Sequence, residues 1–495
     1  MRITPANKPS GDIGEGGWSS QQHYIIVVLF GLEILCSAFV FILCIRSLLS
    51  YKFGLTKLEI LNNGKRVPVS DNFMRTLISI ISLFISTLCF SQVTKTVETI
   101  IVDSGKYEFK LQTKKDTADY SKAFRILTNQ VRLNPKNAEY RYFLGYAIDR
   151  LNAEDGKGMV QLKKEMTLKA SEQIEEVNRL EPVYKGELFI LDPYAKLTSI
   201  WGSLAGAYLS RKLFDSARWA FSEGKRRGGF IEPILEFNRQ LLNSCDKNAI
   251  LVTYGDNITI PIWYLQTIEN YRADISVVDA NLINTVWYPK YLKSEKNLNM
   301  SFSDAIIDTI EYKQWQPQQV KIINSIDTSQ KFSWELRPTY MNNYILKGDR
   351  ILLDIFQKNF FKRPIYFNNN SDSTYNLFLS RYLVDEGLVN RVTTKVFNYN
   401  DSIVSVSKNL YYYNIDNIKV DDLAKSKDAI FVLNGFRWTY YNNVYHLVTQ
   451  GNYEKAKELI KLMGNQFKTD KLPFTSLEVE KYFADFFQQL DKNYR

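Results

Sequence analysis

Two long apolar stretches stand out near the N-terminus of the chain. Residues 23–49 read HYIIVVLFGLEILCSAFVFILCIRSLL, which is longer than the roughly 20 apolar residues that span a bilayer. Residues 75–93 are shorter and richer in Ser and Thr, so they fit either a second span or a signal-like segment. Because the given chain begins ahead of both stretches, we predict two retained transmembrane helices that contact membrane lipid.

The first predicted span contains one acidic residue, Glu33. A carboxylate in lipid is costly, so we expect Glu33 to be protonated, to face a partner helix or to lie near the headgroups. Residues 50–74, between the two stretches, carry more Lys and Arg than Asp and Glu, which places this loop in the cytoplasm. The tail at residues 1–22 and the large region after residue 93 are then expected on the outer side.

After the predicted spans, the hydrophobic pattern is helical in two regions, residues 94–245 and 431–495. In the first region, large and small residues recur at the spacing with which paired helices of a tetratricopeptide repeat, about 34 residues long, interlock. The matched positions are Trp201, Leu204, Ala205, Tyr208, Ala217, Phe221 and Gly224. We predict TPR-like helices in both regions and a partner-binding region marked by Trp201, Tyr208 and Phe221, with a structural spacer as the alternative.

Residues 246–430 differ from the helical regions on either side, because β-rich and helical segments alternate here. AILVTYGDN is a short β-rich run, ITIPIWYLQTIENYR has helical spacing and ADISVVDAN is β-rich again, which predicts a strand, a helix and a parallel strand. Residues 362–370, 373–387 and 388–396 predict a second unit of the same kind. The expected fold is therefore an α/β central domain with a small parallel or mixed, Rossmann-like sheet, flanked by TPR-like helices.

Polar residues follow the predicted strands, at the edge where ligands of open α/β sheets gather. The predicted polar pocket comprises Asp256, Asn257, Asp279, Asn281, Asn368 and Asn369. Such a pocket suits a hydroxyl-rich ligand such as a glycan. Alternatively, Gly-Asp-Asn only makes a turn, and Asn257 or Thr259 caps the helix ahead of Pro261. A third interpretation makes Asp256 and Asp279 an acid/base pair, as in glycoside hydrolysis.

The composition argues against several kinds of binding and catalytic site. A net charge of +10 over 495 residues is too thin to indicate nucleic-acid binding. Three of the four cysteines lie in the apolar stretches and the chain has two histidines, so neither a disulfide framework nor a zinc site is expected. A Ser-His-Asp triad would need His446, which lies in a helical pattern. We predict no cofactor, no metal and no catalytic residue, and we leave enzymatic activity open while favouring its absence.

Three segments carry a resemblance to a known family. They are GDNITIPIWYLQTIENYRADISVVDANLINTVWY, GDRILLDIFQKNFFKRPIYF and SRYLVDEGLVNRV. From about Asn248 to Val396, the chain resembles the C-terminal extracytoplasmic region of large multi-pass proteins of Bacteroidota, a family that is similar to protein O-mannosyltransferases. The resemblance implies a protein of the bacterial inner membrane whose large C-terminal region lies in the periplasm.

The chain departs from this family at Ile258 and Ile260, where the family has an acidic and an aromatic residue. Two spans also cannot rebuild the family's many-helix membrane core. We therefore expect a membrane-anchored periplasmic scaffold or accessory subunit that binds protein partners in an inner-membrane complex. The alternatives are a glycan- or acceptor-peptide-binding accessory protein of a glycosylation system and a carboxylate-dependent glycan-active enzyme.

Overall fold

The computed structural model describes residues 59–62, 65–68, 104–156, 158–368, 374–396 and 407–493. Both predicted spans, Glu33 and Asn369 lie outside these residues. In the described part of the chain, no helix combines the length and the hydropathy that a membrane crossing needs. The chain forms two compact units, one over Pro5–Tyr107 and one that includes Glu108–Arg495.

The described part of the smaller unit contains a β-hairpin. Strands β1 (Glu59–Asn62) and β2 (Lys65–Pro68) pair antiparallel, with Glu59 opposite Pro68. The two residues between them in the sequence are Asn63-Gly64, the pair that two-residue hairpin turns favour. The sequence predicts only a loop at residues 50–74, so this hairpin was not expected.

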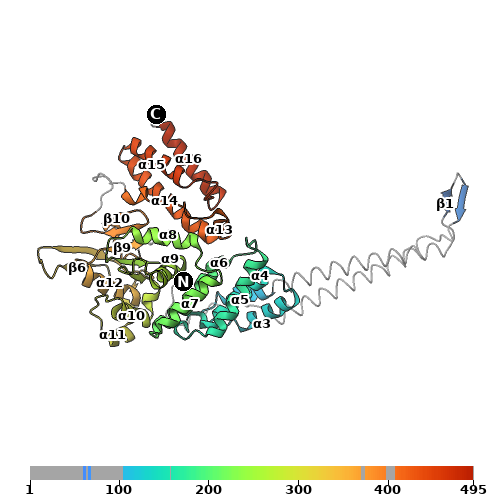
Figure 1. Ribbon diagram of the computed structural model, residues 1–495, viewed down its shortest axis with the longest axis horizontal. Coiled ribbons are helices and arrows are strands. Elements are labelled where there is room, and N and C mark those ends of the chain that lie inside the picture. The colour runs from blue at the N-terminus through green and yellow to red at the C-terminus, as the bar shows by residue number, and fades with distance from the viewer. Residues whose placement is uncertain are drawn as a thin grey trace. The chain divides into compact units, whose positions relative to one another are not determined.

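The larger unit begins with helices that pack side by side along the chain (Figure 1). They are α3 (Ser121–Leu133), α4 (Ala138–Asn152), α5 (Lys164–Leu180), α6 (Pro193–Ser210) and α7 (Phe214–Arg226). Helix α8 (Glu232–Asn243) follows, and it packs against later elements of the chain. Two short 3-10 turns, η1 (Glu154–Gly156) and η2 (Met159–Gln161), separate α4 from α5.

Glycines set how closely these helices approach one another. A Cβ atom on Gly145 of α4 would lie 2.7 Å from Cδ1 of Ile174 on α5, and one on Gly224 of α7 would lie 2.6 Å from Cβ of Trp201 on α6. Trp201 is fully buried and donates its indole N–H to the Ser171 hydroxyl at 2.9 Å. The interlock of large and small residues that the sequence pattern indicates is therefore present in these helix pairs.

The sheet of the larger unit is mixed, with the strand order β10-β11-β9-β3-β4. Its strands are β3 (Ile250–Thr253), β4 (Ser276–Asp279), β9 (Ile365–Asn368), β10 (Leu383–Asp385) and β11 (Val389–Val392). Strand β3 is parallel to both β4 and β9, and helix α9 (Asp256–Ile268) connects β3 to β4. This arrangement confirms the strand, helix, strand unit predicted at residues 249–279.

The second predicted unit of this kind is wrong. Instead of a helix at residues 373–387, the described residues contain the 3-10 turn η4 (Ser380–Tyr382) and strand β10, and β11 runs antiparallel to both β9 and β10. The Gly387 N–H donates to the Asp385 carboxylate at 2.7 Å, and Gly387 has a φ of 97°, which an α-helix cannot contain. The chain therefore turns back as a hairpin.

Helices cover both faces of this sheet. Val252 and Thr253 of β3 point to opposite faces because side chains alternate along a strand. On the Thr253 face, the Thr253 hydroxyl shares a hydrogen bond of 2.8 Å with Thr259 of α9. On the other face, Phe367, the register partner of Val252, stacks on Phe356 of α12 (Lys347–Asn359) with 6.1 Å between ring centroids. The chain crosses from β3 to β4 through α9 and returns from β4 to β9 through α12. Right-handed crossovers that run in opposite directions place their helices on opposite faces of a sheet.

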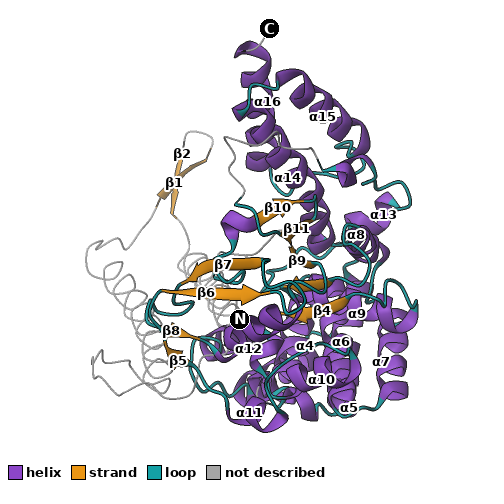
Figure 2. Ribbon diagram, turned by 90° about the vertical axis from the view of Figure 1, so that its left-hand side faces the viewer, coloured by secondary structure: helices purple, strands orange, loops and turns teal. Residues whose placement is uncertain are grey.

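The remaining elements surround this core (Figure 2). Between β4 and α12 lie η3 (Leu282–Asn284), α10 (Trp287–Glu295), α11 (Asp304–Thr309), β5 (Lys313–Gln314), β6 (Gln318–Ile323), β7 (Lys331–Leu336) and β8 (Tyr344–Ile345). After β11 come η5 (Lys408–Tyr411), α13 (Val420–Ala424), α14 (Lys427–Thr449), α15 (Tyr453–Gln466) and α16 (Leu477–Asn493). The boundary expected between residues 430 and 431 thus falls inside α14.

Helix α6 lies directly against α9, and two glycines make this approach possible. A Cβ atom on Gly202 would lie 2.1 Å from Cγ2 of Ile260, and one on Gly206, a turn further along α6, would lie 3.4 Å from the Trp263 ring. Ile260 and Trp263 are both buried. The N-terminal helices are therefore fixed to the α/β region by close backbone packing.

Replacing Gly202 by Ala should destabilise the protein, because the new methyl group would overlap the branched Cβ region of Ile260. We expect the free energy of unfolding to fall by about 1–3 kcal/mol, measured by chemical denaturation of the full chain. Gly464→Ala on α15 is the matched control, since a Cβ there meets no atom within 4 Å, and Ala should stabilise that helix by up to about 1 kcal/mol. Equal effects of the two substitutions would contradict the close packing of α6 on α9.

Candidate functional site

The first predicted site residues lie at the start of α9, directly after β3. Gly255 precedes this helix with a φ of 95°, and no side chain caps its N-terminus. The prediction that Asn257 or Thr259 caps α9 is therefore wrong. Both side chains are used in tertiary contacts instead: Asn257 donates to Asp428 of α14 at 2.9 Å, and Thr259 donates to Asp279 at 2.5 Å.

Asp428 belongs to a junction between α6 and α14 that the sequence analysis did not find. Asp192 is the N-cap of α6, where its Oδ1 accepts the N–H groups of Tyr194 and Ala195, both at 2.9 Å. Its Oδ2 accepts the Asp428 N–H at 2.8 Å and the Ser426 hydroxyl at 2.5 Å, and Ser426 is the N-cap of α14. One buried carboxylate thus binds the N-termini of two helices.

The two aspartates interact reciprocally. The Asp192 N–H donates to Oδ2 of Asp428 at 2.5 Å, while Oδ1 of Asp428 accepts from Asn257. The positive ends of α6 and α14 stabilise negative charge at this junction. Lys196, one turn after Asp192 on α6, forms its ion pair with Asp149 of α4 at 2.6 Å. Burial, and after it the charge of Asp192, raises the pKa of Asp428 to about 7.

Asp279 lies at the end of β4 and is almost fully buried. Its carboxylate accepts hydrogen bonds from the Thr259 hydroxyl and from the N–H groups of Asn281 at 2.9 Å and Leu282 at 2.8 Å. Burial raises its pKa, and these hydrogen bonds oppose the rise. These contacts are those of a residue that fixes the turn after β4, so they do not support a role for Asp279 in acid/base chemistry.

The other predicted pocket residues differ in exposure. The side chain of Asp256 is exposed and its Oδ2 accepts from the Ser199 hydroxyl of α6 at 2.9 Å. Asn281 is half-buried beside η3, and Asn368 is buried at the end of β9. The structure thus brings Asp256 and Asn257 to the side of α9 that faces α6 and α14, while Asp279 turns toward its own loop.

Pro261 explains a further contact at the start of α9. Proline has no N–H, so the Asn257 carbonyl lacks its usual helix donor four residues ahead. Asn238 of α8, which is fully buried, supplies the missing donor: its Nδ2 lies 3.0 Å from the Asn257 carbonyl oxygen. A side chain of α8 therefore replaces the hydrogen bond that Pro261 removes from α9.

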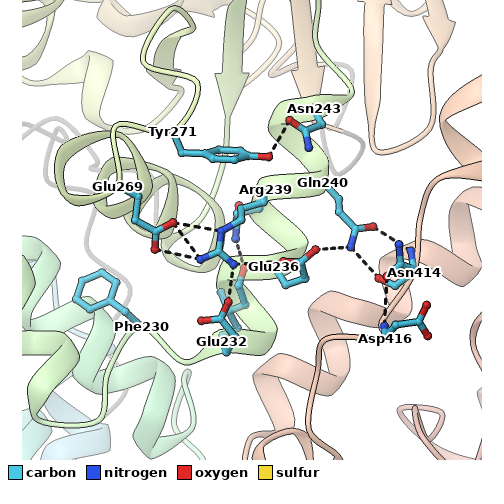
Figure 3. A network of polar contacts seen from close by, with 12 residues as sticks. Phe230, Glu232, Glu236, Arg239, Gln240, Asn243, Glu269, Tyr271, Asn414 and Asp416 are labelled. Carbon is cyan, nitrogen blue, oxygen red and sulfur yellow. Dashed lines mark hydrogen bonds and ion pairs between the residues drawn. The ribbon is translucent and has the colours of Figure 1, made fainter.

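Helix α8 also carries a polar network that links α9 to the segment before α13 (Figure 3). Arg239 binds Glu232 at 2.5 Å and Glu236 at 3.2 Å on its own helix, and Glu269 at the end of α9 at 3.0 Å. Gln240 donates to the Asn414 carbonyl at 2.7 Å and accepts from the Asn414 N–H at 3.1 Å. The glutamates raise the pKa of Arg239 although burial opposes this rise. Among these contacts, only the pair of Glu236 and Arg239, three residues apart on α8, follows from sequence spacing.

The residues that mark the predicted partner-binding region lie on α6 and α7. Trp201 and Phe221 are fully buried and Tyr208 is half-buried. Trp201 and Phe221 thus build the interior of this helical region and not its surface. Within the described residues, no group of three or more His, Cys, Asp or Glu side chains gathers as metal ligands would.

The fold and these contacts define a helical protein that contains a mixed five-stranded sheet. Residues 234–337 and 314–407 each match the family model TMEM260-associated domain 2. The matched stretches run from α8 past β11 and include the residues that carry the resemblance found in the sequence. Comparison with curated proteins and with solved structures gives no significant match.

The bond from Asn238 to Asn257 can be tested by a double-mutant cycle. Asn238→Ala should lower the free energy of unfolding by about 1–3 kcal/mol, because it leaves the half-buried Asn257 carbonyl without a donor. In a Pro261→Ala background the same substitution should cost about 1 kcal/mol less, since an alanine at this position restores the helical N–H. Chemical denaturation of the four proteins gives the coupling energy, and a coupling near zero would refute the compensation.

The junction predicts a dependence of stability on pH. The carboxyl pKa of Asp428 rises from an ordinary 3.8 to about 7 on folding, so the folded chain binds this proton more tightly between those values. Its contribution to stability is therefore fully present below about pH 4 and is lost as the pH rises to 7. Burial raises the pKa of Asp385 to about 7 as well, with the same sign.

Asp428→Asn should remove part of this dependence, because the amide resembles the protonated carboxyl group. We expect the free energy of unfolding of the parent protein to fall between pH 5 and pH 8. In the variant, this fall should be smaller by at least about 1 kcal/mol. Denaturant titrations at several pH values measure the difference. Asp421→Asn, at an exposed position on α13, is the control and should follow the parent curve; an Asp428→Asn curve that does the same would contradict the assignment.

Proposed function

We propose that this chain is a membrane-anchored periplasmic scaffold or accessory subunit that binds a protein partner through its helical regions. The observation that carries the proposal is a row of exposed aromatic side chains on α14, which we name the α14 stripe: Phe431, Trp438 and Tyr445. Their exposed fractions are 64%, 40% and 49%. Large apolar side chains gathered on one surface are typical of protein interaction sites.

The spacing of the α14 stripe supports this proposal. The residues are seven apart, so they repeat every two turns along one side of the helix over about 20 Å. Tyr482 of α16 is 48% exposed, and its hydroxyl forms a hydrogen bond of 2.5 Å with the Tyr441 hydroxyl of α14. Tyr482 therefore lies next to α14 and widens the exposed aromatic surface. Tryptophan and tyrosine are the residues on which interface energy most often concentrates.

The acidic residues support binding over catalysis. The carboxylates of Asp192, Asp279 and Asp428 each accept hydrogen bonds from helix or loop termini within the chain, so their oxygens are occupied by structural partners. A partner-binding role also agrees with TPR-like repeats, whose paired helices commonly bind peptides or helices. The match to a domain described as TMEM260-associated agrees with a link to membrane proteins that are similar to O-mannosyltransferases, and such a link suits an accessory role.

Glycan binding is the second candidate, and the exposed Asp256 favours it. Gly255 beside it would meet no atom within 4 Å if it carried a Cβ, so the approach to the start of α9 is open. Binding of glycans that Asp256→Ala abolishes would favour this candidate over a protein scaffold.

The scaffold proposal is tested by replacing the α14 stripe with serine. The Phe431→Ser, Trp438→Ser, Tyr445→Ser variant should lose at least about tenfold in partner recovery from gently solubilised membranes, since each aromatic contributes about 1–2 kcal/mol at an interface. Tyr412→Ser, at a side chain that is 74% exposed but lies after η5, is the control and should retain the partner. Quantitative mass spectrometry of the recovered complexes measures both.

A photocrosslinking amino acid at position 438 should attach the same partner, whereas one at position 412 should not. Identical recovery by the stripe variant and the parent protein, or a parent protein that is isolated as a monomer at native abundance, would refute the proposal. Circular dichroism establishes that the variants are folded.

A further inference from the structure

A hollow opens where β9 and β11 part at the amino end of β9. The ladder between these strands ends at the pair Arg391 and Tyr366. It cannot extend through Pro364, which has no N–H to donate. The resulting hollow has a volume of about 360 Å³, and its polar wall comprises Lys362, Arg363, Arg391, Thr393 and Thr394, with the Phe361 ring beside them.

The wall of this hollow contains three cations and no carboxylate. Arg363 is half-buried, and its guanidinium donates only to neutral groups: the Asn248 carbonyl at 2.8 Å, the Ala249 carbonyl at 3.0 Å and the Ser276 hydroxyl at 2.9 Å. Burial lowers the pKa of Arg363, and the nearby charge of Asp274 opposes this fall only in part.

The two other cations differ in their partners. Lys362 is exposed, and it forms no ion pair with another described residue. Arg391 uses Nη1 for ion pairs with Asp246 at 3.1 Å and Glu386 at 3.7 Å. A guanidinium has five N–H donors in a planar fork, so Arg391 retains donors beyond those that face its two carboxylates. The hollow therefore offers several charge-assisted donors to a bound molecule.

We propose that this hollow binds a small ligand through an oxyanion, a phosphate or carboxylate group. Arginine and lysine side chains recognise such groups by charge-assisted hydrogen bonds, and Thr394 adds a hydroxyl at the exposed rim. The volume falls in the range of small-molecule sites, and the Phe361 ring supplies an apolar surface for the rest of the ligand. This binding site is independent of the proposed scaffold role.

The test uses calorimetric titration of the full detergent-solubilised chain at low ionic strength with inorganic phosphate, glucuronate and neutral glucose. We expect phosphate or glucuronate to bind. The anion that binds more tightly identifies whether the hollow prefers a phosphate or a carboxylate group. Glucose should not bind. Lys362→Glu should weaken that binding by at least about tenfold, because it places a carboxylate at the rim of the hollow. Lys321→Glu, at an exposed position on β6, reverses a charge elsewhere and should leave the affinity unchanged.

A second variant tests the half-buried cation. Arg363→Lys keeps the positive charge but removes the planar donor fork, and it should weaken binding less than Lys362→Glu does. Its folding is followed by circular dichroism, since Arg363 also ties β9 to the starts of β3 and β4. The proposal is overturned if neither anion binds the parent protein, or if Lys362→Glu and Lys321→Glu bind the anion equally well.

Discussion

The Asp192 carboxylate is the contact on which the arrangement of the larger unit depends. It accepts four hydrogen bonds, two from the first turn of α6 and two from the start of α14, although these helices begin more than 230 residues apart in the chain. Hydrogen bonds to a charged group contribute about 1.5–3 kcal/mol each. Asn257 adds α9 to the same junction through Asp428, so one carboxylate pair connects the N-terminal helices, the sheet and the C-terminal helices.

This arrangement has a cost that explains the unusual pKa of Asp428. The buried carboxylate of Asp192 and the half-buried carboxylate of Asp428 repel each other, and their negative charge is offset mainly by helix N-termini and N–H donors. The same constraint recurs at Asp279, whose hydrogen bonds close the turn after β4. Acidic residues at the end of a sheet are thus not by themselves evidence of catalysis. The free N–H groups of turns and helix termini also need hydrogen-bond acceptors, and carboxylates supply them.

The internal contacts leave two surfaces open, the α14 stripe and the hollow beside Arg363. The α14 stripe exposes aromatic rings on a helix that is otherwise well packed against α8, where Phe237 meets Phe436 with 5.1 Å between ring centroids. A rigid helix that presents exposed aromatic rings loses little conformational entropy when a partner binds. The hollow beside Arg363 lies at the opposite end of β9 from the predicted pocket, where a proline ends the strand ladder. The α14 stripe suits an apolar face of a protein partner, whereas the hollow suits a small anion.

Local sequence determined the features that depend on neighbouring residues. The alternation of β-rich and helical segments at residues 249–279 predicted β3, α9 and β4, and the large and small residues around Trp201 and Gly224 predicted helices that interlock. Tertiary structure alone decided which polar side chains meet. Asn257 looked like a cap because caps are local, yet Asp428 and Asn238 reach it from 171 and 19 residues away. Likewise, the helix expected at residues 373–387 gave way to a hairpin, because a turn at Asp385 and Gly387 and pairing with the distant β9 outweighed the local helical pattern.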